Sequence, residues 1–247
     1  MNLTTIIITK NEELNISNAI KSVKFSDQII VVDAGSTDKT VEIAKSLGAE
    51  TISEDFDNFS KQRETGLKLV KSDYVFYLDA DERASQELRE SIEKVLRGES
   101  DLDVYRISRQ NYYFGRYPWP YIAKLVRLFK KDSIKGWRGK IHESPLYDGK
   151  VGELTGLILH FTHNDLTSMT KKTIDWSETE AQMRIDAKHA KMSWWRFPRV
   201  MIPTFFNYYF RQGGYKLGTA GLIESIFQTF STFITYAKLW EKQEKLN

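Results

Sequence analysis

The sequence of 247 residues contains no cysteine. Disulfide bonds, thiolate metal sites, iron–sulfur clusters and a cysteine nucleophile are therefore excluded. The chain also lacks the glycine-rich first turn of two classes of nucleotide-binding protein. That turn reads Thr9-Lys10-Asn11-Glu12, where a nicotinamide dehydrogenase has Gly-x-Gly-x-x-Gly and a sugar-nucleotide pyrophosphorylase has Gly-x-Gly-x-Arg. Both classes are disfavoured.

An excess of one charge and long apolar runs are also missing. The 36 Lys and Arg residues oppose 33 Asp and Glu residues, a balance that does not favour nucleic acid as a partner. Two uncharged stretches, 200–210 and 225–237, fall short of the roughly 18–20 residues of a membrane-spanning helix. The N-terminal residues enter an apolar strand at once, so no signal peptide is expected. A reducing cytoplasm suits a chain without cysteine.

The first hundred residues alternate apolar strands with helical patterns. This alternation predicts an α/β fold whose sheet is parallel in its first half. The expected strands are 3–9, 28–32, 49–53 and 74–78, and the expected helices are 13–23, 38–47, 60–70 and 85–96. Beyond residue 103 we expect strands at 104–109, 123–129 and 151–159, an aromatic loop at 112–121 and a helix at 165–191.

Polar clusters follow three of the predicted strands. They are Thr9 to Glu12, Asp33 to Asp38 and Asp79 to Glu82. Parallel sheets bind ligands beyond the carboxyl ends of their strands, so these clusters are expected to converge on one site. The pair Asp79 and Asp81 supplies two carboxylates suited to Mg²⁺ or Mn²⁺, ions that hold diphosphates. Each cluster alone would equally suit a helix cap or turn.

Three segments, 6–12, 31–40 and 77–82, resemble glycosyltransferase family 2 in order and spacing. The resemblance continues in Arg127-Leu128-Phe129, in Lys140-Ile141-His142-Glu143 and at His160. The branch it most resembles is the lipopolysaccharide core β-1,4-glucosyltransferases. It implies the GT-A fold of nucleotide-diphospho-sugar transferases, a Rossmann-like mixed sheet flanked by helices, here with a C-terminal helical appendage.

The resemblance also implies roles for individual residues. Residues expected to bind the nucleotide are Thr9, Asn11, Glu12, Asp33, Asp38, Lys61, Arg63 and Asp79. Asp33 would bond the uracil ring, and Asp79 the ribose. The expected metal ligands are Asp79, Asp81 and His160, with Mg²⁺ or Mn²⁺ as the cofactor.

Glu143 is the candidate catalytic base. An inverting sugar transfer requires a group that takes the proton of the acceptor hydroxyl, and a positioned carboxylate does this. Glu143 lies in a turn-rich polar stretch, 136–145, of the kind in which functional residues gather. A surface ion pair with Lys140 or Arg138 is the alternative. Better-known family members place their acidic base further along the chain, and this sequence departs from that pattern.

Residues 193–240 differ in composition from the rest of the chain. They hold 14 of the 32 aromatic residues, and five basic residues against one acidic residue, Glu224. Six apolar residues fall on one helical stripe: Ile223, Ile226, Phe227, Phe230, Ile234 and Ala237. Such a composition is typical of a helix at a membrane interface. Packing on the catalytic domain or on another subunit is the alternative, and an oligomer stays open.

These observations predict a catalytic GT-A domain over 1–165, with a nucleotide-binding half at 1–100 and an acceptor-binding half at 101–165. A helical region follows over 166–247. The activity that the resemblance implies is an inverting, metal-dependent transfer of a hexose, first of all glucose from UDP-glucose, to a glycan or glycolipid such as lipopolysaccharide core. The expected location is the inner face of the cytoplasmic membrane. A non-catalytic scaffold that keeps the fold is the alternative from another class.

Overall fold

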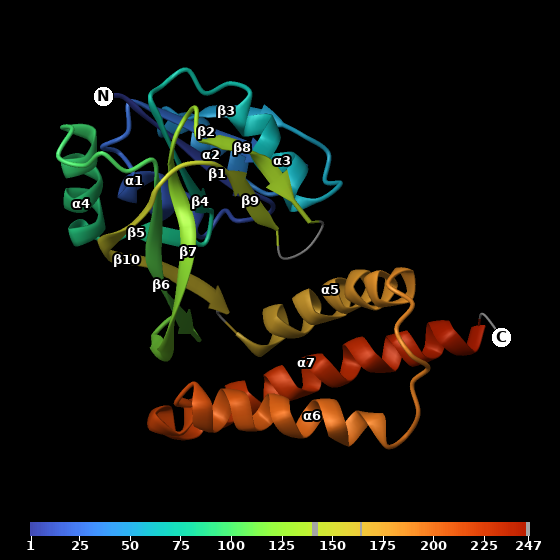
Figure 1. Cartoon of the computed structure of the whole chain (residues 1–247). Helices are drawn as coiled ribbons and strands as arrows, with labels where there is room; N and C mark the ends of the chain where they lie inside the picture. Colours follow the sequence, from blue (N-terminus) through green and yellow to red (C-terminus); the bar gives the residue numbers. More distant parts are fainter. Residues whose placement is uncertain (140–142, 164, 246–247) are drawn as a thin grey trace. The chain divides into compact units, whose positions relative to one another are not determined.

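A computed structural model describes residues 1–139, 143–163 and 165–245 (Figure 1). By contact the chain divides into two compact units. Unit 1 comprises 1–110 with 123–160, and unit 2 comprises 111–122 with 161–247. The functional division predicted at residue 165 stays a prediction. The motif residues Lys140, Ile141 and His142 lie outside the described residues.

A mixed sheet forms the centre of unit 1, with the strand order β3-β2-β1-β4-β7-β6-β10-β5. β1 pairs in parallel with β2 and β4, and β2 pairs in parallel with β3, as the sequence predicts. β4 pairs antiparallel with β7, and β10 antiparallel with β5. The strands are β1 (Leu3–Thr9), β2 (Gln28–Asp33), β3 (Glu50–Ser53), β4 (Tyr74–Asp79), β5 (Glu82–Ala84), β6 (Val104–Tyr113), β7 (Tyr117–Lys130) and β10 (Val151–His163). The predicted α/β class with a mixed sheet is confirmed.

Both faces of the sheet are covered, which explains the continuous apolar runs of its parallel strands. One apolar cluster joins Leu3 and Ile7 of β1 to residues of three helices. These are α1 (Ile16–Ser22), α2 (Thr40–Ser46) and α4 (Gln86–Leu96). The second cluster joins Ile6 and Ile8 of β1 to the opposite layer. That layer consists of α3 (Phe59–Leu67) and the hairpin of β8 (Ile134–Arg138) and β9 (Ser144–Tyr147).

The α3 helix lies unusually close to the sheet. A Cβ atom at Gly66 would stand 2.7 Å from the Cγ2 atom of Ile6, so only glycine fits there. The β8–β9 hairpin, which the sequence did not predict, packs on α3 from outside. The backbone N–H of Trp137 donates to the carboxylate of Glu64 at 3.1 Å. This contact holds the end of β8 beside α3, and Glu143 lies directly before β9.

The predicted aromatic loop at 112–121 is wrong. β6 runs on to Tyr113 and β7 begins at Tyr117, so most of the segment is a hairpin with a turn at 114–116. Alternation is hard to read there because aromatic residues stand at successive positions. Trp119 is buried within unit 2, where its indole N–H donates to Gln212 at 2.8 Å.

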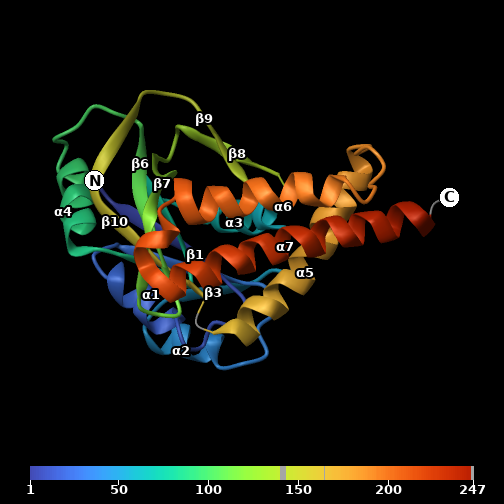
Figure 2. The same cartoon turned by 90° about the horizontal axis from the view of Figure 1, so that it is seen from below.

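Helices make up the rest of unit 2, which confirms the predicted helical appendage. They are α5 (Leu166–Asp186), α6 (Arg196–Phe206), a π-helical turn (Asn207–Arg211), a 3₁₀ turn (Gly214–Leu217) and α7 (Gly218–Lys245). α7 packs beside both α5 and α6 (Figure 2). The helix that the sequence predicts at 165–191 ends five residues earlier in the structure, at Asp186 of α5. A Cβ atom at Gly221 would lie 1.8 Å from the carbonyl oxygen of Gly214, so this contact requires glycine. None of the helices, within the residues described, is long and apolar enough to cross a bilayer.

The face of α7 that points into unit 2 carries a carboxyl group. Glu224 is fully buried, its Oε1 atom accepts a hydrogen bond from Gln228 at 2.7 Å, and its Oε2 atom bonds no described group. Burial raises the pKa of Glu224 to about 7, against an ordinary value of 4.5, although the bond from Gln228 opposes the rise. The folded state therefore favours the protonated, neutral form.

This burial predicts a pH-dependent stability. An acid whose pKa is raised on folding stabilises fully below pH 4.5 and loses that contribution as pH rises through about 7. Glu224→Gln keeps the shape and removes the charge. We expect the free energy of unfolding of the variant, relative to the native chain, to increase by about 2–3 kcal/mol between pH 5 and pH 8. Urea unfolding at the two pH values measures this, and parallel pH profiles would contradict the assignment.

Candidate active site

The carboxyl ends of β1, β2 and β4 lie side by side. Thr9 stands opposite Asp33 in the β1–β2 register, and Ile8 stands opposite Asp79 in the β1–β4 register. The three polar clusters that follow these strands therefore meet at one edge of the sheet, as expected for ligand binding by a parallel sheet.

Hydrogen bonds tie the loop after β1 to the loop after β2. The side-chain oxygen of Asn11 accepts from the backbone N–H of Thr37 at 2.8 Å, and the backbone N–H of Asn11 donates to the Ser36 hydroxyl at 2.8 Å. The N–H of Glu12 donates to the Thr40 hydroxyl at 2.8 Å. Asn11 has φ of 52°, a left-handed conformation that asparagine adopts more readily than most residues. The two loops thus form one preorganised rim.

Two acidic residues predicted to bind the nucleotide, Asp33 and Asp38, accept hydrogen bonds within this rim. Asp33 is buried and accepts from the backbone N–H groups of Gly35 and Ser36, at 3.1 and 2.8 Å. Asp38 accepts from the backbone of Thr40 at 3.0 Å and of Glu13 at 3.1 Å. Burial opposes ionisation of Asp38, but these bonds and the Thr40 hydroxyl outweigh it and lower the pKa below its ordinary value. Local hydrogen bonds thus hold the Asp33 side chain in its turn and favour the ionised form of Asp38.

Thr9 offers a buried group with unused bonding capacity. Its side chain is almost fully buried at the end of β1, and its hydroxyl has no partner among the described residues. A buried polar group without a partner is costly, and a ligand that bonded it would remove that cost. This supports the prediction that Thr9 lines a binding pocket.

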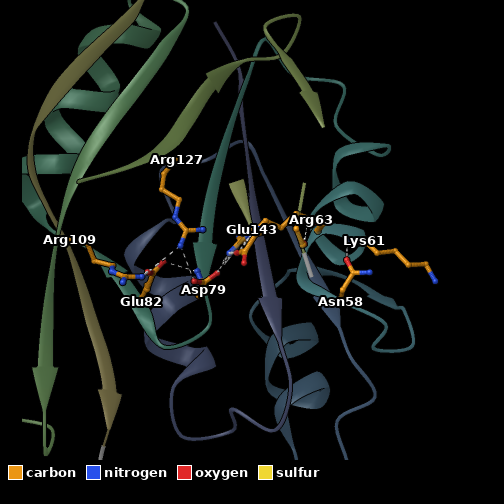
Figure 3. A network of polar contacts seen from close by, with 10 residues as sticks. Asn58, Lys61, Arg63, Asp79, Glu82, Arg109, Arg127 and Glu143 are labelled. Carbon is orange, nitrogen blue, oxygen red and sulfur yellow. Dashed lines mark hydrogen bonds and ion pairs between the residues drawn. The ribbon is translucent and has the colours of Figure 1, made fainter. Parts of the chain in front are cut away.

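A chain of buried ion pairs crosses the site (Figure 3). It alternates acidic and basic side chains from α3, β4, β5, β6, β7 and the loop before β9, and we call it the ion-pair chain. Its members, in spatial order, are Glu143, Arg63, Asp79, Arg127, Glu82 and Arg109.

Arg63 is the centre of one half of the ion-pair chain. Its guanidinium donates to Asp79 at 2.7 Å and twice to Glu143 Oε1, at 3.0 and 2.8 Å. Its carbon Cζ lies 4.8 Å from the centre of the Trp137 ring and 5.8 Å from that of Tyr77. The side chain is only 1% exposed. Arg63 thereby joins a nucleotide-binding candidate to the candidate base.

Asp79 accepts from two arginines at once. Oδ1 accepts from Arg63 and Oδ2 from Arg127 at 3.0 Å, while its backbone N–H donates to Glu82 Oε2 at 3.0 Å. Burial alone would raise the pKa of Asp79, but Arg127 and Arg63 outweigh it and hold the pKa well below its ordinary value. Each oxygen of Asp79 thus bonds one guanidinium, and the predicted role of Asp79 as a metal ligand stays a prediction.

Asp81 and His160 face each other. Oδ2 of Asp81 lies 3.3 Å from Nε2 of His160, and each side chain is about one-seventh exposed. The pairing of β10 with β5 brings them together, since it sets His160 opposite Glu82. Over 1–139, 143–163 and 165–245, no cluster of three or more His, Asp or Glu residues could hold a metal ion. Two convergent ligands nevertheless fit Mg²⁺ or Mn²⁺, which is bound through few carboxylates together with substrate phosphates.

The structure separates Lys61 from this constellation. Its ammonium group pairs with Glu54 at 2.8 Å, and its side chain is about half exposed. In Figure 3 it points away from the ion-pair chain. The predicted contact of Lys61 with the nucleotide is therefore without support in this arrangement and stays a prediction.

Three members of the ion-pair chain had no predicted role. Glu82 and Arg127 lie inside the segments that carry the family resemblance, whereas Arg109 lies in no motif. A charged residue within an apolar strand could have indicated such a role, because a buried charge requires a partner of opposite charge. Arg127 interrupts the apolar part of β7 and is almost fully buried.

The fold and the site together define a class. The chain is an α/β protein with a preorganised polar rim and a dense charged cluster at the carboxyl edge of its sheet. A family model described as glycosyl transferase family 2 matches residues 4–174. The chain belongs to this family and is a glycosyltransferase, so the predicted family and enzyme class are confirmed.

Its relatives cover nearly the whole chain. An uncharacterized glycosyltransferase of Rickettsia typhi is 30% identical over 97% of this chain and 87% of its own length. The lipopolysaccharide core biosynthesis glycosyltransferase LpsC of Rhizobium meliloti is 27% identical over 97% and 92%. Among solved structures, a Mycobacterium tuberculosis glucosyl-3-phosphoglycerate synthase in complex with Mn²⁺, UDP and glucosyl-3-phosphoglycerate shares 22% identity and a TM-score of 0.37. The aligned part covers 45% of this chain and 44% of the synthase chain. So weak a likeness carries no argument about function.

Arg63 and Lys61 allow a matched stability test. Arg63→Ala leaves Asp79 and Glu143 without a shared buried cation, so we expect the free energy of unfolding to fall by about 3–5 kcal/mol. Lys61→Ala, two positions away on α3, removes an exposed pair and should leave the unfolding midpoint unchanged. Urea unfolding of both variants measures this. Equal effects of the two changes would show that the ion-pair chain does not hold the site together.

Proposed function

We propose that the chain transfers a hexose, with inversion, from a UDP-sugar to a glycan or lipid-linked acceptor such as lipopolysaccharide core. The foremost donor candidate is UDP-glucose. The observation that carries the proposal is the meeting of Asp81 with His160 at 3.3 Å, near the edge that also buries the unpartnered hydroxyl of Thr9. The name of LpsC supports the class of acceptor.

Asp81 and His160 would hold the divalent cation. A bound Mg²⁺ or Mn²⁺ stabilises the negative charge that develops on a departing diphosphate. The rim formed by Asn11, Asp33 and Asp38 would hold the nucleoside, and Asp79 the ribose. Arg63 and Arg127 keep Asp79 ionised and fixed.

Glu143 would accept the proton of the acceptor hydroxyl. Both of its contacts with Arg63 use Oε1, and Oε2 has no partner among the described residues. The two bonds from Arg63 would fix the carboxylate through Oε1 and leave Oε2 available to accept a proton, as a general base requires. An acceptor hydroxyl bound at hydrogen-bond distance from Oε2 would complete the arrangement.

The acceptor defines the expected location. A lipid-linked acceptor requires that the enzyme work at the inner face of the cytoplasmic membrane, through peripheral contact. The aromatic and basic composition of residues 193–240 supports this.

Titration calorimetry of UDP tests the nucleotide–metal site. We expect Mn²⁺ to increase the affinity for UDP at least tenfold, because the cation bridges protein and phosphates. Asp81→Asn should abolish that increase and leave metal-free binding unchanged. Asp148→Asn, at an exposed acid that follows β9 and pairs with Lys135, is the control. UDP binding that is indifferent to both Mn²⁺ and Asp81 would refute the proposed site.

Glu143→Gln tests the base. A positioned base contributes roughly 10²–10⁴-fold, so turnover of UDP-glucose should fall by that factor while the Kd for UDP stays within about threefold. Glu153→Gln, at an exposed acid paired with Lys124, should retain activity. A thermal melt separates loss of chemistry from loss of the Arg63 contact. Near-normal turnover in Glu143→Gln would remove Glu143 from the mechanism.

A further inference from the structure

The last helix of unit 2, α7, buries several polar residues and exposes several apolar ones. Its buried positions include Gly221, Glu224, Ser225 and Thr235. Half of the apolar stripe that the sequence predicts lies outside: Ile223, Ile226 and Phe230 are 39%, 54% and 42% exposed, whereas Ile234 and Ala237 are half-buried. Of the stripe, Phe227 is buried. A water-soluble helix normally buries its apolar side, so this arrangement calls for a partner that covers the exposed side.

The α6 helix and the π-helical turn that follows it also expose apolar side chains. Ile202, Phe206 and Phe210 are each more than half exposed, and the rings of Phe206 and Phe210 lie 5.1 Å apart. A shallow groove of about 270 Å³ joins the two helices. It is lined by Met201, Ile202, Phe205, Phe206, Ile226 and Thr229. We define the apolar platform as Ile202, Phe206, Phe210, Ile223, Ile226 and Phe230.

The exposed charge of the segment that carries the apolar platform, 193–240, has one sign. Arg199, Arg211 and Lys216 are exposed and form no ion pair with any residue that the structure describes. The sole acidic residue in 193–240 is Glu224, which is fully buried. An apolar surface in a segment with exposed, unpaired cations complements an anionic lipid surface, whose headgroups pair with the cations while the aromatic side chains enter the acyl boundary.

We propose that the apolar platform is a membrane-docking surface for anionic phospholipid, on which α6 and α7 lie in the plane of the interface. Exposed aromatic and aliphatic side chains enter the bilayer boundary, and Arg199, Arg211 and Lys216 contact the headgroups. The helices lie on the membrane and do not cross it. The proposal rests on the peripheral location proposed above and is independent of the sugar-transfer chemistry.

Vesicle flotation of the full chain tests the surface. We expect binding to vesicles of phosphatidylcholine mixed with phosphatidylglycerol, at least tenfold weaker binding to phosphatidylcholine alone, and loss of binding at high salt. Removal of three basic residues in Arg199→Gln/Arg211→Gln/Lys216→Gln should weaken partitioning by about 100-fold, since each cation contributes about fivefold.

Ile226→Ser/Phe230→Ser tests the apolar contribution. These side chains are exposed, so the variant should fold normally and lose at least tenfold in vesicle binding. Leu146→Ser, at an exposed leucine of β9 in unit 1, is the control and should bind as the native chain does. UDP titration of the same variants should be unchanged, so a failed docking surface and a failed nucleotide site give different results.

Two outcomes would overturn the proposal. One is a native chain that does not float with either type of vesicle. The other is a native chain that forms a dimer by light scattering, with Ile226→Ser/Phe230→Ser converting it to a monomer while vesicle binding is absent or unaffected. In that case the platform pairs two copies of the chain.

Discussion

The site depends on one buried guanidinium. Arg63 is only 1% exposed and is shared between Asp79 of β4 and Glu143 of the loop before β9. A buried cation is tolerated only when it is paired and hydrogen-bonded. α3 therefore has to approach the sheet closely, which Gly66 permits. The β8–β9 hairpin has to fold back onto α3 to deliver Glu143. The positions of Asp79 and Glu143 thus follow from the need of the buried Arg63 for partners of opposite charge.

The ion-pair chain also limits what the site can offer a diphosphate. Three guanidinium groups, of Arg63, Arg109 and Arg127, are matched by three carboxylates, so the chain is neutral as a whole. Such a balance stabilises the geometry but supplies no surplus positive charge at the place where a leaving group becomes more negative. Lys61, the other basic residue predicted to reach the nucleotide, pairs with Glu54 at the surface. The neutrality of this network is in keeping with the proposal that a cation held by Asp81 and His160 would balance the charge of the diphosphate.

Sequence reasoning was strongest where the physics is local. β-branched runs, helical spacing and strand-end acids such as Asp33 and Asp79 located the parallel sheet and the edge at which its polar clusters meet. It failed where structure depends on distant partners. The contact of Arg63 with Glu143 spans 80 residues, and no local pattern encodes it. The β8–β9 hairpin contains Gly136 and Pro145, residues that are uncommon in strands. In 112–121, dense aromatic residues hid the alternation of a hairpin.

In unit 2 the local sequence pattern and the observed packing of α7 disagree. Rotation of α7 about its axis would bury Ile226 and Phe230 and release Glu224 to water, which removes both an exposed apolar surface and a carboxyl whose pKa burial raises to about 7. The close contact of Gly221 with Gly214 fixes the helix against that rotation. Buried apolar surface contributes about 25 cal/mol per Å², so a fold that leaves six large apolar side chains outside is at a disadvantage in water. The disadvantage disappears where that surface meets an apolar phase, and the orientation of α7 is then the more stable one.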